Sequence, residues 1–155
     1  MKKINSTLNY IIEELITLPL LNIVPWLPRL ALGIAFFFHG YGKLPAPFMM
    51  NEQHRMVTWF ESIFIPMPEL WVNLVILGEM AAGIGIILGG LVGLFASQLG
   101  HLLTRLSGLL VVIIMTCALF IAHSDWFTSL STKFVTSEQM FLLVLGIFFA
   151  IRGNK

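Results

Sequence analysis

The chain has 155 residues, of which 57% are hydrophobic and only 11% are charged. Soluble domains carry about 25% charged residues, so we expect lipid rather than water to be the main solvent of this chain. The formal net charge of +1 and the lack of a basic cluster give no support to nucleic-acid binding. The single cysteine, Cys117, excludes an internal disulfide and a Cys-x-x-Cys redox motif within this chain.

Apolar segments within residues 25–155 predict an all-α integral membrane protein, a bundle of four transmembrane helices. The predicted spans are about 26–44, 70–96, 105–123 and 137–151. Pro25 and Pro28 fit the start of the first span, where missing backbone donors cost least, and Pro45 and Pro47 end it. The second apolar run is longer than a bilayer requires, and the fourth is short for one.

Two further segments are expected at the membrane surface. In residues 1–24, apolar side chains recur at three- and four-residue spacing, which predicts an amphipathic helix lying on the membrane. These side chains are Ile4, Leu8, Ile11, Leu15 and Leu18. Residues 46–69 form a long polar loop, and its apolar part, Met56–Met67, is too short to cross a bilayer.

The distribution of Lys and Arg predicts the orientation of the chain, because cytoplasmic loops are enriched in both. If the N-terminus is cytoplasmic, the inner side holds Lys2, Lys3, Arg29, Arg105, Arg152 and Lys155. The outer side then holds only Lys43, Arg55 and Lys133. We therefore expect both termini in the cytoplasm.

Glu79 is expected near the middle of the membrane, about 14 Å along the second span at the rise of an α-helix. An ionisable residue at that depth costs ~2.5–3.5 kcal/mol on insertion scales. Pairing with Arg29, Lys43 or Arg105 would keep its carboxylate charged. Arg29 and Arg105 begin their helices, where arginine usually extends to lipid phosphates. The alternative is that one of them reaches inward to neutralise Glu79, and Arg29, just inside the first span, is the candidate for this. Two interpretations remain open: a proton-handling or ligand-binding group, and a structural ion pair.

Four polar residues are expected at the outer end of the bundle. His39 and Lys43 are one helical turn apart, His123 ends the third span and Glu138 begins the fourth. Such a cluster is typical of a pocket for a polar headgroup, such as a quinone ring. The alternative is that these side chains only extend to the membrane surface. No pair of ligands at metal-binding spacing shares a helix, so we expect no metal site.

Small residues recur every four positions along the second span. They are Ala81, Gly85, Gly89, Gly93 and Ser97. Small residues at this spacing allow another helix to approach closely, so they predict a packing surface within the bundle or between subunits.

Three stretches of the chain form a recognisable pattern: Arg29–Leu44 with its His39-Gly-Tyr-Gly-Lys43 ending, Leu77–Gly90 with Glu79 and several glycines, and Thr104-Arg105-Leu followed by Met115, Ala118 and His123. In this order they resemble the DoxX family of small membrane proteins. The resemblance extends from about Trp26 to Ile151 and implies a four-helix inner-membrane protein of bacteria. The polar residues that match the family are Arg29, His39, Lys43, Glu79, Arg105 and His123.

The chain departs from the family pattern in three places. Leu91–Leu103 separates the second helix from the Thr-Arg pair, so whether Arg105 reaches Glu79 stays open. The usual Gly-x-Gly and Ser-x-Asp ending is replaced by Arg152-Gly-Asn-Lys, and the N-terminal amphipathic segment is longer than in many relatives. These differences are candidate docking surfaces for a partner.

The resemblance implies a redox-associated role, because relatives include a subunit of a thiosulfate–quinone oxidoreductase and a component linked to methylamine dehydrogenase maturation. The chain offers no redox centre of its own, so we expect it to act with a quinone or an oxidoreductase partner. Two alternatives remain: a non-catalytic accessory subunit of a larger membrane complex or homo-oligomer, and a small proton-coupled transporter. No residue is assigned a catalytic role.

Overall fold

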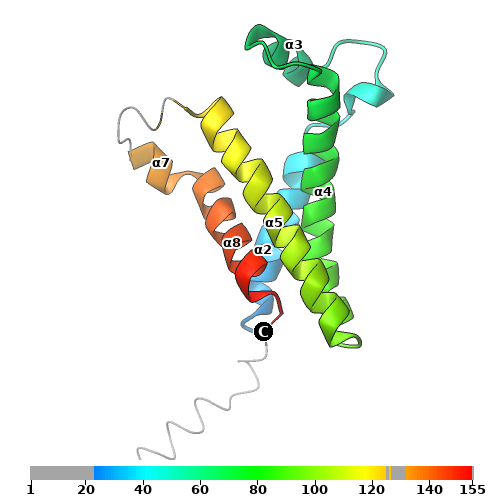
Figure 1. The fold of residues 1–155 in the computed structure, drawn as a ribbon, viewed down its shortest axis with the longest axis vertical. Coiled ribbons are helices and arrows are strands. Elements are labelled where there is room, and N and C mark those ends of the chain that lie inside the picture. Colours follow the sequence, from blue (N-terminus) through cyan, green and yellow to red (C-terminus); the bar gives the residue numbers. More distant parts are fainter. Residues whose placement is uncertain (1–22, 125, 127–131, 155) are drawn as a thin grey trace, which may run out of the picture.

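The structure is a computed structural model that describes residues 23–124, 126 and 132–154. Within these residues the chain is all-helical, as the sequence predicts. The longest helices are α2 (Trp26–Tyr41), α4 (Pro68–Gly93), α5 (Ser97–Ala122) and α8 (Glu138–Arg152) (Figure 1). Shorter helices are η2 (Pro47–Met49), α3 (Arg55–Ser62) and α7 (Thr132–Thr136). The surface helix predicted over residues 1–24 lies outside the described residues, apart from its last two positions.

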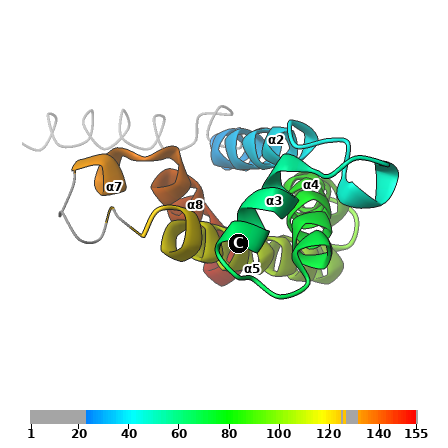
Figure 2. The ribbon, with the colours of Figure 1, turned by 90° about the horizontal axis from the view of Figure 1, so that it is seen from above.

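The four long helices pack side by side in a closed order. α4 packs against both α2 and α5, α5 packs against α8, and α8 makes a smaller contact with α2. Figure 2, seen from above, shows α4 beside α2 and α8 beside α5. α2 and α5 begin, and α4 and α8 end, at one end of this group, which we call the Arg29 end. The opposite end, where α3 lies, is called the α3 end (Figure 1).

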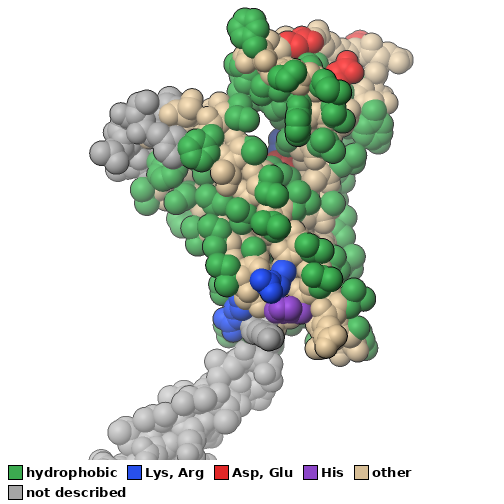
Figure 3. Space-filling view, in the orientation of Figure 1, with side chains coloured by type: hydrophobic (Ala, Val, Ile, Leu, Met, Phe, Trp, Pro, Cys, Tyr) green, Lys and Arg blue, Asp and Glu red, His purple; other side chains and the backbone are tan. Residues whose placement is uncertain are grey.

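The outer surface of the helix group is strongly apolar. Large hydrophobic side chains are exposed on each long helix, among them Leu27, Leu74, Ile113 and Phe141 (Figure 3). Of the described helices, α4 and α5 are long and apolar enough to cross a membrane by themselves. Apolar surface of this extent is rare on soluble monomers, which favours lipid as the surrounding solvent.

Proline and a capping serine set several helix starts. Pro25 precedes α2, Pro28 lies in its first turn, and Pro68 is the first residue of α4, where a missing backbone N–H costs little. The Ser137 hydroxyl accepts a hydrogen bond from the Met140 backbone N–H at 3.2 Å and so caps the start of α8. The long loop of the sequence prediction contains α3, an eight-residue helix within the segment expected at the interface.

The first predicted span, 26–44, extends beyond the helix that the structure shows. α2 ends at Tyr41, and the Lys43 and Leu44 N–H groups donate to carbonyls three residues earlier, as in a tight turn. The fourth span, 137–151, corresponds closely to α8.

The boundary between the second and third predicted spans differs most from the structure. The apolar run to residue 96 suggested one long helix, whereas α4 ends at Gly93 and residues 94–96 form a turn. α5 then begins at Ser97, about two helical turns before the predicted start at 105. Hydropathy does not mark this boundary, because Leu94 and Phe95 in the turn are apolar, while the first two turns of α5 mix polar residues with leucines.

Glycines bring the long helices into backbone contact. A Cβ atom on Gly83 would lie 2.5 Å from α2 backbone atoms, one on Gly100 would lie 2.3 Å from the α4 backbone, and one on Gly108 would lie 2.5 Å from the α8 backbone. Each of these distances is too short for any side chain. The three main helix contacts therefore depend on positions that only glycine can occupy.

The predicted stripe of small residues divides between two environments. Gly85, Gly89 and Gly93 pack within the chain, where added Cβ atoms would meet Ser107, Thr104 and Asn154. Ala81 and Ser97 are exposed, and Ser97 belongs to α5 rather than to the second span. The glycines of this stripe lie on the α5 side of α4, whereas Gly83 lies on its α2 side.

We expect Gly108→Ala to lower the free energy of unfolding by about 1–3 kcal/mol, because the methyl group would push α8 away from α5. Thermal or dodecyl-sulfate unfolding of the purified protein, followed by circular dichroism, measures this loss. The matched control is Gly78→Ala, whose Cβ would meet only flexible side-chain ends, the nearest at 3.0 Å. Equal losses in the two variants would contradict the role of the α5–α8 backbone contact.

Candidate functional site

The Glu79 carboxylate is buried within α4, with 2% of the residue exposed, and forms an ion pair with the Lys43 ammonium. Lys43 lies in the turn after α2, and its Nζ also donates to the His39 carbonyl at 3.0 Å. α2 approaches α4 closely here, because a Cβ on Gly40 would lie 2.7 Å from the Ile76 carbonyl oxygen. Of the three cations considered from the sequence, Lys43 is the partner of Glu79.

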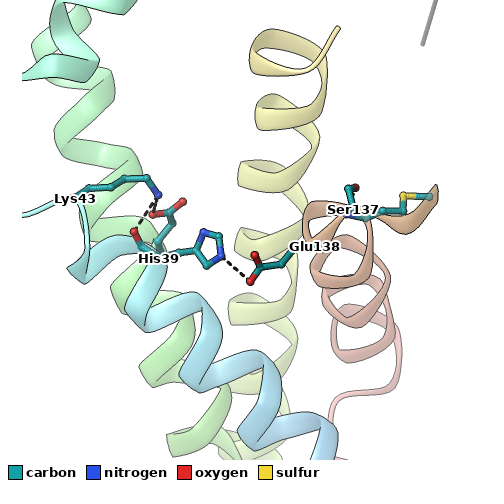
Figure 4. Close-up of polar contacts among 6 residues, drawn as sticks. His39, Lys43, Ser137 and Glu138 are labelled. Atoms are coloured by element: carbon teal, nitrogen blue, oxygen red, sulfur yellow. Dashed lines mark hydrogen bonds and ion pairs between the residues drawn. The ribbon is translucent and has the colours of Figure 1, made fainter. Parts of the chain in front are cut away.

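A second polar contact links α2 to α8 beside this ion pair. The Nε2 atom of His39 lies 3.0 Å from the Glu138 carboxylate at the start of α8. Figure 4 shows the two side chains reaching toward each other between their helices, next to Lys43. The Glu138 side chain is 62% exposed, so this pair adds little stability. Side chains of α2, α4 and α8 thus meet in one polar group, which we call the His39–Glu79 cluster.

The His39–Glu79 cluster lies where the end of α2 and the start of α8 meet the middle of α4. From about this level α4 and α5 diverge toward the α3 end (Figure 1). Figure 3 shows a hollow between the two diverging arms, with apolar side chains on both sides and Lys or Arg and Asp or Glu atoms at its floor. The Lys43 ammonium has three N–H donors, of which hydrogen bonds to protein atoms use two. Polar groups at the base of apolar walls are typical of a site for a ligand with a polar head and an apolar body.

His123 does not join the three residues with which it was grouped from the sequence. Its ring stacks on Trp126, with centroids 3.9 Å apart and an angle of 20° between the planes. In contrast, His54 lies next to the cluster, because its Nε2 is 2.9 Å from the Lys43 carbonyl oxygen. Among the described residues, no group of three or more His, Cys, Asp or Glu side chains is placed to hold a metal ion.

Arg29 forms a separate polar cluster at the opposite end of the helices. The residue is 5% exposed, and its guanidinium donates to the Ile86 carbonyl at 2.5 Å, the Thr104 hydroxyl at 3.1 Å and the Asn154 side-chain oxygen at 2.8 Å. Arg29 therefore does not neutralise Glu79, because its donors point to α4, α5 and the C-terminal residues at its own end.

Asn154 completes the Arg29 cluster, and the sequence did not single it out. Its side-chain oxygen accepts from the Thr104 hydroxyl at 2.6 Å, and its Nδ2 donates to the Gly89 carbonyl at 2.7 Å. The backbone N–H of Asn154 also donates to His101 Nδ1 at 3.2 Å. Asn154 follows the last helix and belongs to no periodic pattern, so the sequence carries no direct signal for its role. Thr104, a polar residue within an apolar helix, is the one indication of a polar network at this place.

Arg105 is exposed and lies beside the Arg29 cluster rather than near Glu79. Its Nε donates to the Ala150 carbonyl of α8 at 2.9 Å. The sequence left open whether Arg105 reaches Glu79, and in this structure it does not. Arg105 lies in the third turn of α5 and turns toward the end of α8, whereas Glu79 lies near the middle of α4 and faces α2.

We expect Lys43→Met to lower the free energy of unfolding by about 1–3 kcal/mol, because it leaves a buried carboxylate without its partner. Adding Glu79→Gln to Lys43→Met should recover about 1–2 kcal/mol of that loss, a non-additivity typical of residues in contact. Unfolding in detergent of the two single variants and the double variant measures the coupling. The more exposed pair supplies the control: Glu138→Gln should change stability by less than about 1 kcal/mol. Strict additivity of Lys43→Met and Glu79→Gln would rule out the ion pair.

Comparison with known proteins identifies the family. The DoxX family model matches residues 24–124, which include α2, α3, α4 and α5 and therefore Arg29, His39, Lys43, Glu79 and Arg105. No curated protein and no solved structure matches the chain. The match covers well over half of the sequence, and together with the apolar helices it shows that the chain is a membrane protein that belongs to the DoxX family.

Proposed function

We propose that this protein is a redox-associated subunit located in the inner membrane of bacteria. It binds a quinone at the His39–Glu79 cluster and acts with an oxidoreductase partner. The supporting observation is the buried Lys43–Glu79 ion pair beside the His39–Glu138 contact. In the same part of the molecule, Figure 3 shows a hollow with apolar sides and with acidic and basic atoms at its floor. A buried ion pair alone fits a structural role. Its position at an opening between helices, with a donor of Lys43 left over, favours a ligand.

The residues of the cluster suit the chemistry of a quinone. A quinone ring has two carbonyl oxygens that accept hydrogen bonds, and Lys43 and His39 provide N–H donors at this place. Its isoprenoid tail would suit the apolar sides of the hollow. A bound quinone supplies the two-electron chemistry that no side chain of this protein provides, while the Glu79 and Glu138 carboxylates can hold protons near the ring. The electrons would have to come from the partner.

We also propose that α2, α4, α5 and α8 all cross the membrane, with both termini in the cytoplasm. α2 and α8 have 16 and 15 residues, about 24 and 22 Å at the rise of an α-helix, against a hydrocarbon core of about 30 Å. Packing against the longer α4 and α5, together with local thinning of the bilayer, would accommodate them. Arg29, Arg105 and Arg152 all belong to the Arg29 end, which supports a cytoplasmic position for that end by the positive-inside rule.

Thiol labelling of intact cells tests this orientation. In a Cys117→Ser background, Ser62→Cys at the end of α3 should react with a membrane-impermeant maleimide, because the α3 end would face outward. The matched variant Ser97→Cys, equally exposed at the start of α5, should react only after the cells are opened. The reverse pattern would overturn the proposed orientation.

Quinone analysis of the purified protein tests the function. We expect protein extracted in a mild detergent to retain a quinone, measured by chromatography of the organic extract, and Lys43→Met or Glu79→Gln to lower the retained amount at least about tenfold, as for loss of a charge-assisted hydrogen bond. Glu69→Gln is the control, since Glu69 lies on the same helix but is exposed in its first turn. Retention that is equal in all of these variants would reject the proposed site.

The accessory-subunit alternative predicts a different result in the same preparations. It predicts no retained quinone, together with a stable larger complex that persists when Glu79 is replaced. The transporter alternative predicts that Glu79→Gln abolishes proton-coupled uptake while leaving complex formation intact. The three functions are therefore separated by quinone content, complex size and uptake, measured on the wild type and the single variant Glu79→Gln.

A further inference from the structure

A cavity of about 210 Å³ lies at the Arg29 end, between the start of α2 and the end of α8. Val24, Pro28, Phe148 and Phe149 supply apolar walls, and the side chains of Arg29 and Arg152 line the same cavity. It is distinct from the His39–Glu79 cluster, which lies at the other end of the same helices. The cavity therefore combines two guanidinium groups with an apolar lining, and no part of the proposed quinone site contributes to it.

Arg29 is a buried cation whose hydrogen-bond partners are all neutral. Its donors bond a backbone carbonyl, a hydroxyl and an amide oxygen, and its guanidinium lies over the rings of Trp26 and Phe149 at 5.7 and 4.9 Å. No carboxylate among the described residues contacts it. A buried charge without a counter-charge is costly in protein or lipid, so an anion beside Arg29 would lower the free energy of the folded state.

The charges of the described residues are segregated between the two ends. The acidic residues Glu52, Glu61, Glu69, Glu79 and Glu138 all belong to the α3 half of the molecule. The Arg29 end carries Arg29, Arg105 and Arg152, and Figure 3 shows Lys or Arg side chains (blue) on the surface there. None of these five described glutamates lies at the Arg29 end, and the described partners of Arg29 itself are all neutral.

The guanidinium of Arg29 keeps donors for a ligand. Of its five N–H groups, the three hydrogen bonds use both on Nη1 and one on Nη2. The Nε–H and the second Nη2–H have no hydrogen bond to a described protein atom. The exposed guanidinium of Arg152 is held over the Phe148 ring at 5.4 Å, at the same cavity. Planar guanidinium groups are well suited to the oxygens of a phosphate.

We propose that this cavity binds the phosphate group of an anionic phospholipid, with Arg29 and Arg152 as its donors. The apolar walls favour a lipid over a free anion, because they would hold the glycerol and the first carbons of an acyl chain. Val24 and Leu27, both more than half exposed, continue this apolar surface along the outside of α2. By the proposed orientation, the lipid would belong to the cytoplasmic leaflet. The lipid site itself does not rest on the quinone function.

Native mass spectrometry of the protein in detergent, titrated with dioleoylphosphatidylglycerol or dioleoylphosphatidylcholine, tests the proposal. We expect the anionic lipid to bind more tightly than the zwitterionic lipid, and Arg152→Gln to weaken its binding about tenfold or more, as for loss of a charged hydrogen bond. Arg105→Gln removes the same charge from the same end but does not line the cavity, so it should change the affinity less than about threefold. An equal loss in both variants would show unspecific surface attraction and overturn the site.

Two further measurements keep the proposal testable if an arginine variant is unstable. Val24→Trp changes no charge and should fill the cavity, so it should also lower retention of the anionic lipid while circular dichroism shows a folded protein. Inorganic phosphate, added alone, should not compete with the lipid at millimolar concentration. Full competition by phosphate, or unchanged lipid binding in a folded Val24→Trp, would overturn the lipid assignment.

Discussion

Close approach of α4 to both α2 and α5 is the constraint on which the other features of this structure depend. Gly83 lies on the α2 side of α4 and Gly89 on its α5 side, and a Cβ at either position would collide with a neighbouring helix. Because lipid gives no hydrophobic driving force between helices, such backbone contact and its dispersion energy are the main attraction available. α4 is thereby held between two partners, with its one buried carboxylate turned toward α2.

The same contacts explain where charge is tolerated inside the helix group. Lys43 reaches Glu79 because α2 and α4 touch at Gly40, and Arg29 reaches the Thr104 hydroxyl because Gly89 admits the α5 backbone. Between these two polar clusters lies an apolar core, which includes Leu32, Phe36, Ile86, Val111 and Phe149. The chain therefore places its buried charge in two separate groups, one at the Arg29 end and one where the end of α2 meets the middle of α4, and each charge has hydrogen-bond or ion-pair partners that lower its cost.

The two polar clusters differ in chemistry, and each therefore suits a different class of ligand. In the His39–Glu79 cluster, cation and carboxylate are paired in the part of the molecule where Figure 3 shows a hollow. This arrangement suits a neutral ligand that exchanges hydrogen bonds and protons. At the Arg29 end, buried positive charge has only neutral partners, which suits an anion. The contact between α2 and α8 is smaller than the other contacts between neighbouring long helices, and a lipid bound between them would stabilise it. The same helix α2 carries His39 and leads into Lys43 at its other end.

The amino-acid sequence by itself determined that lipid is the main solvent and that the chain is all-helical, because composition and helical periodicity are local properties. It also showed the resemblance to the family and the polar residues that need a partner. It placed the starts of α2 and α8 well, since prolines and the Ser137 cap mark them. Only the tertiary structure decided which charges meet. Lys43 pairs with Glu79 across 36 positions, His39 with Glu138 across 99, and Arg29 with Asn154 across 125. Such pairings depend on how far each helix is rotated and how closely its glycines let it approach, and neither quantity can be read from one helix alone.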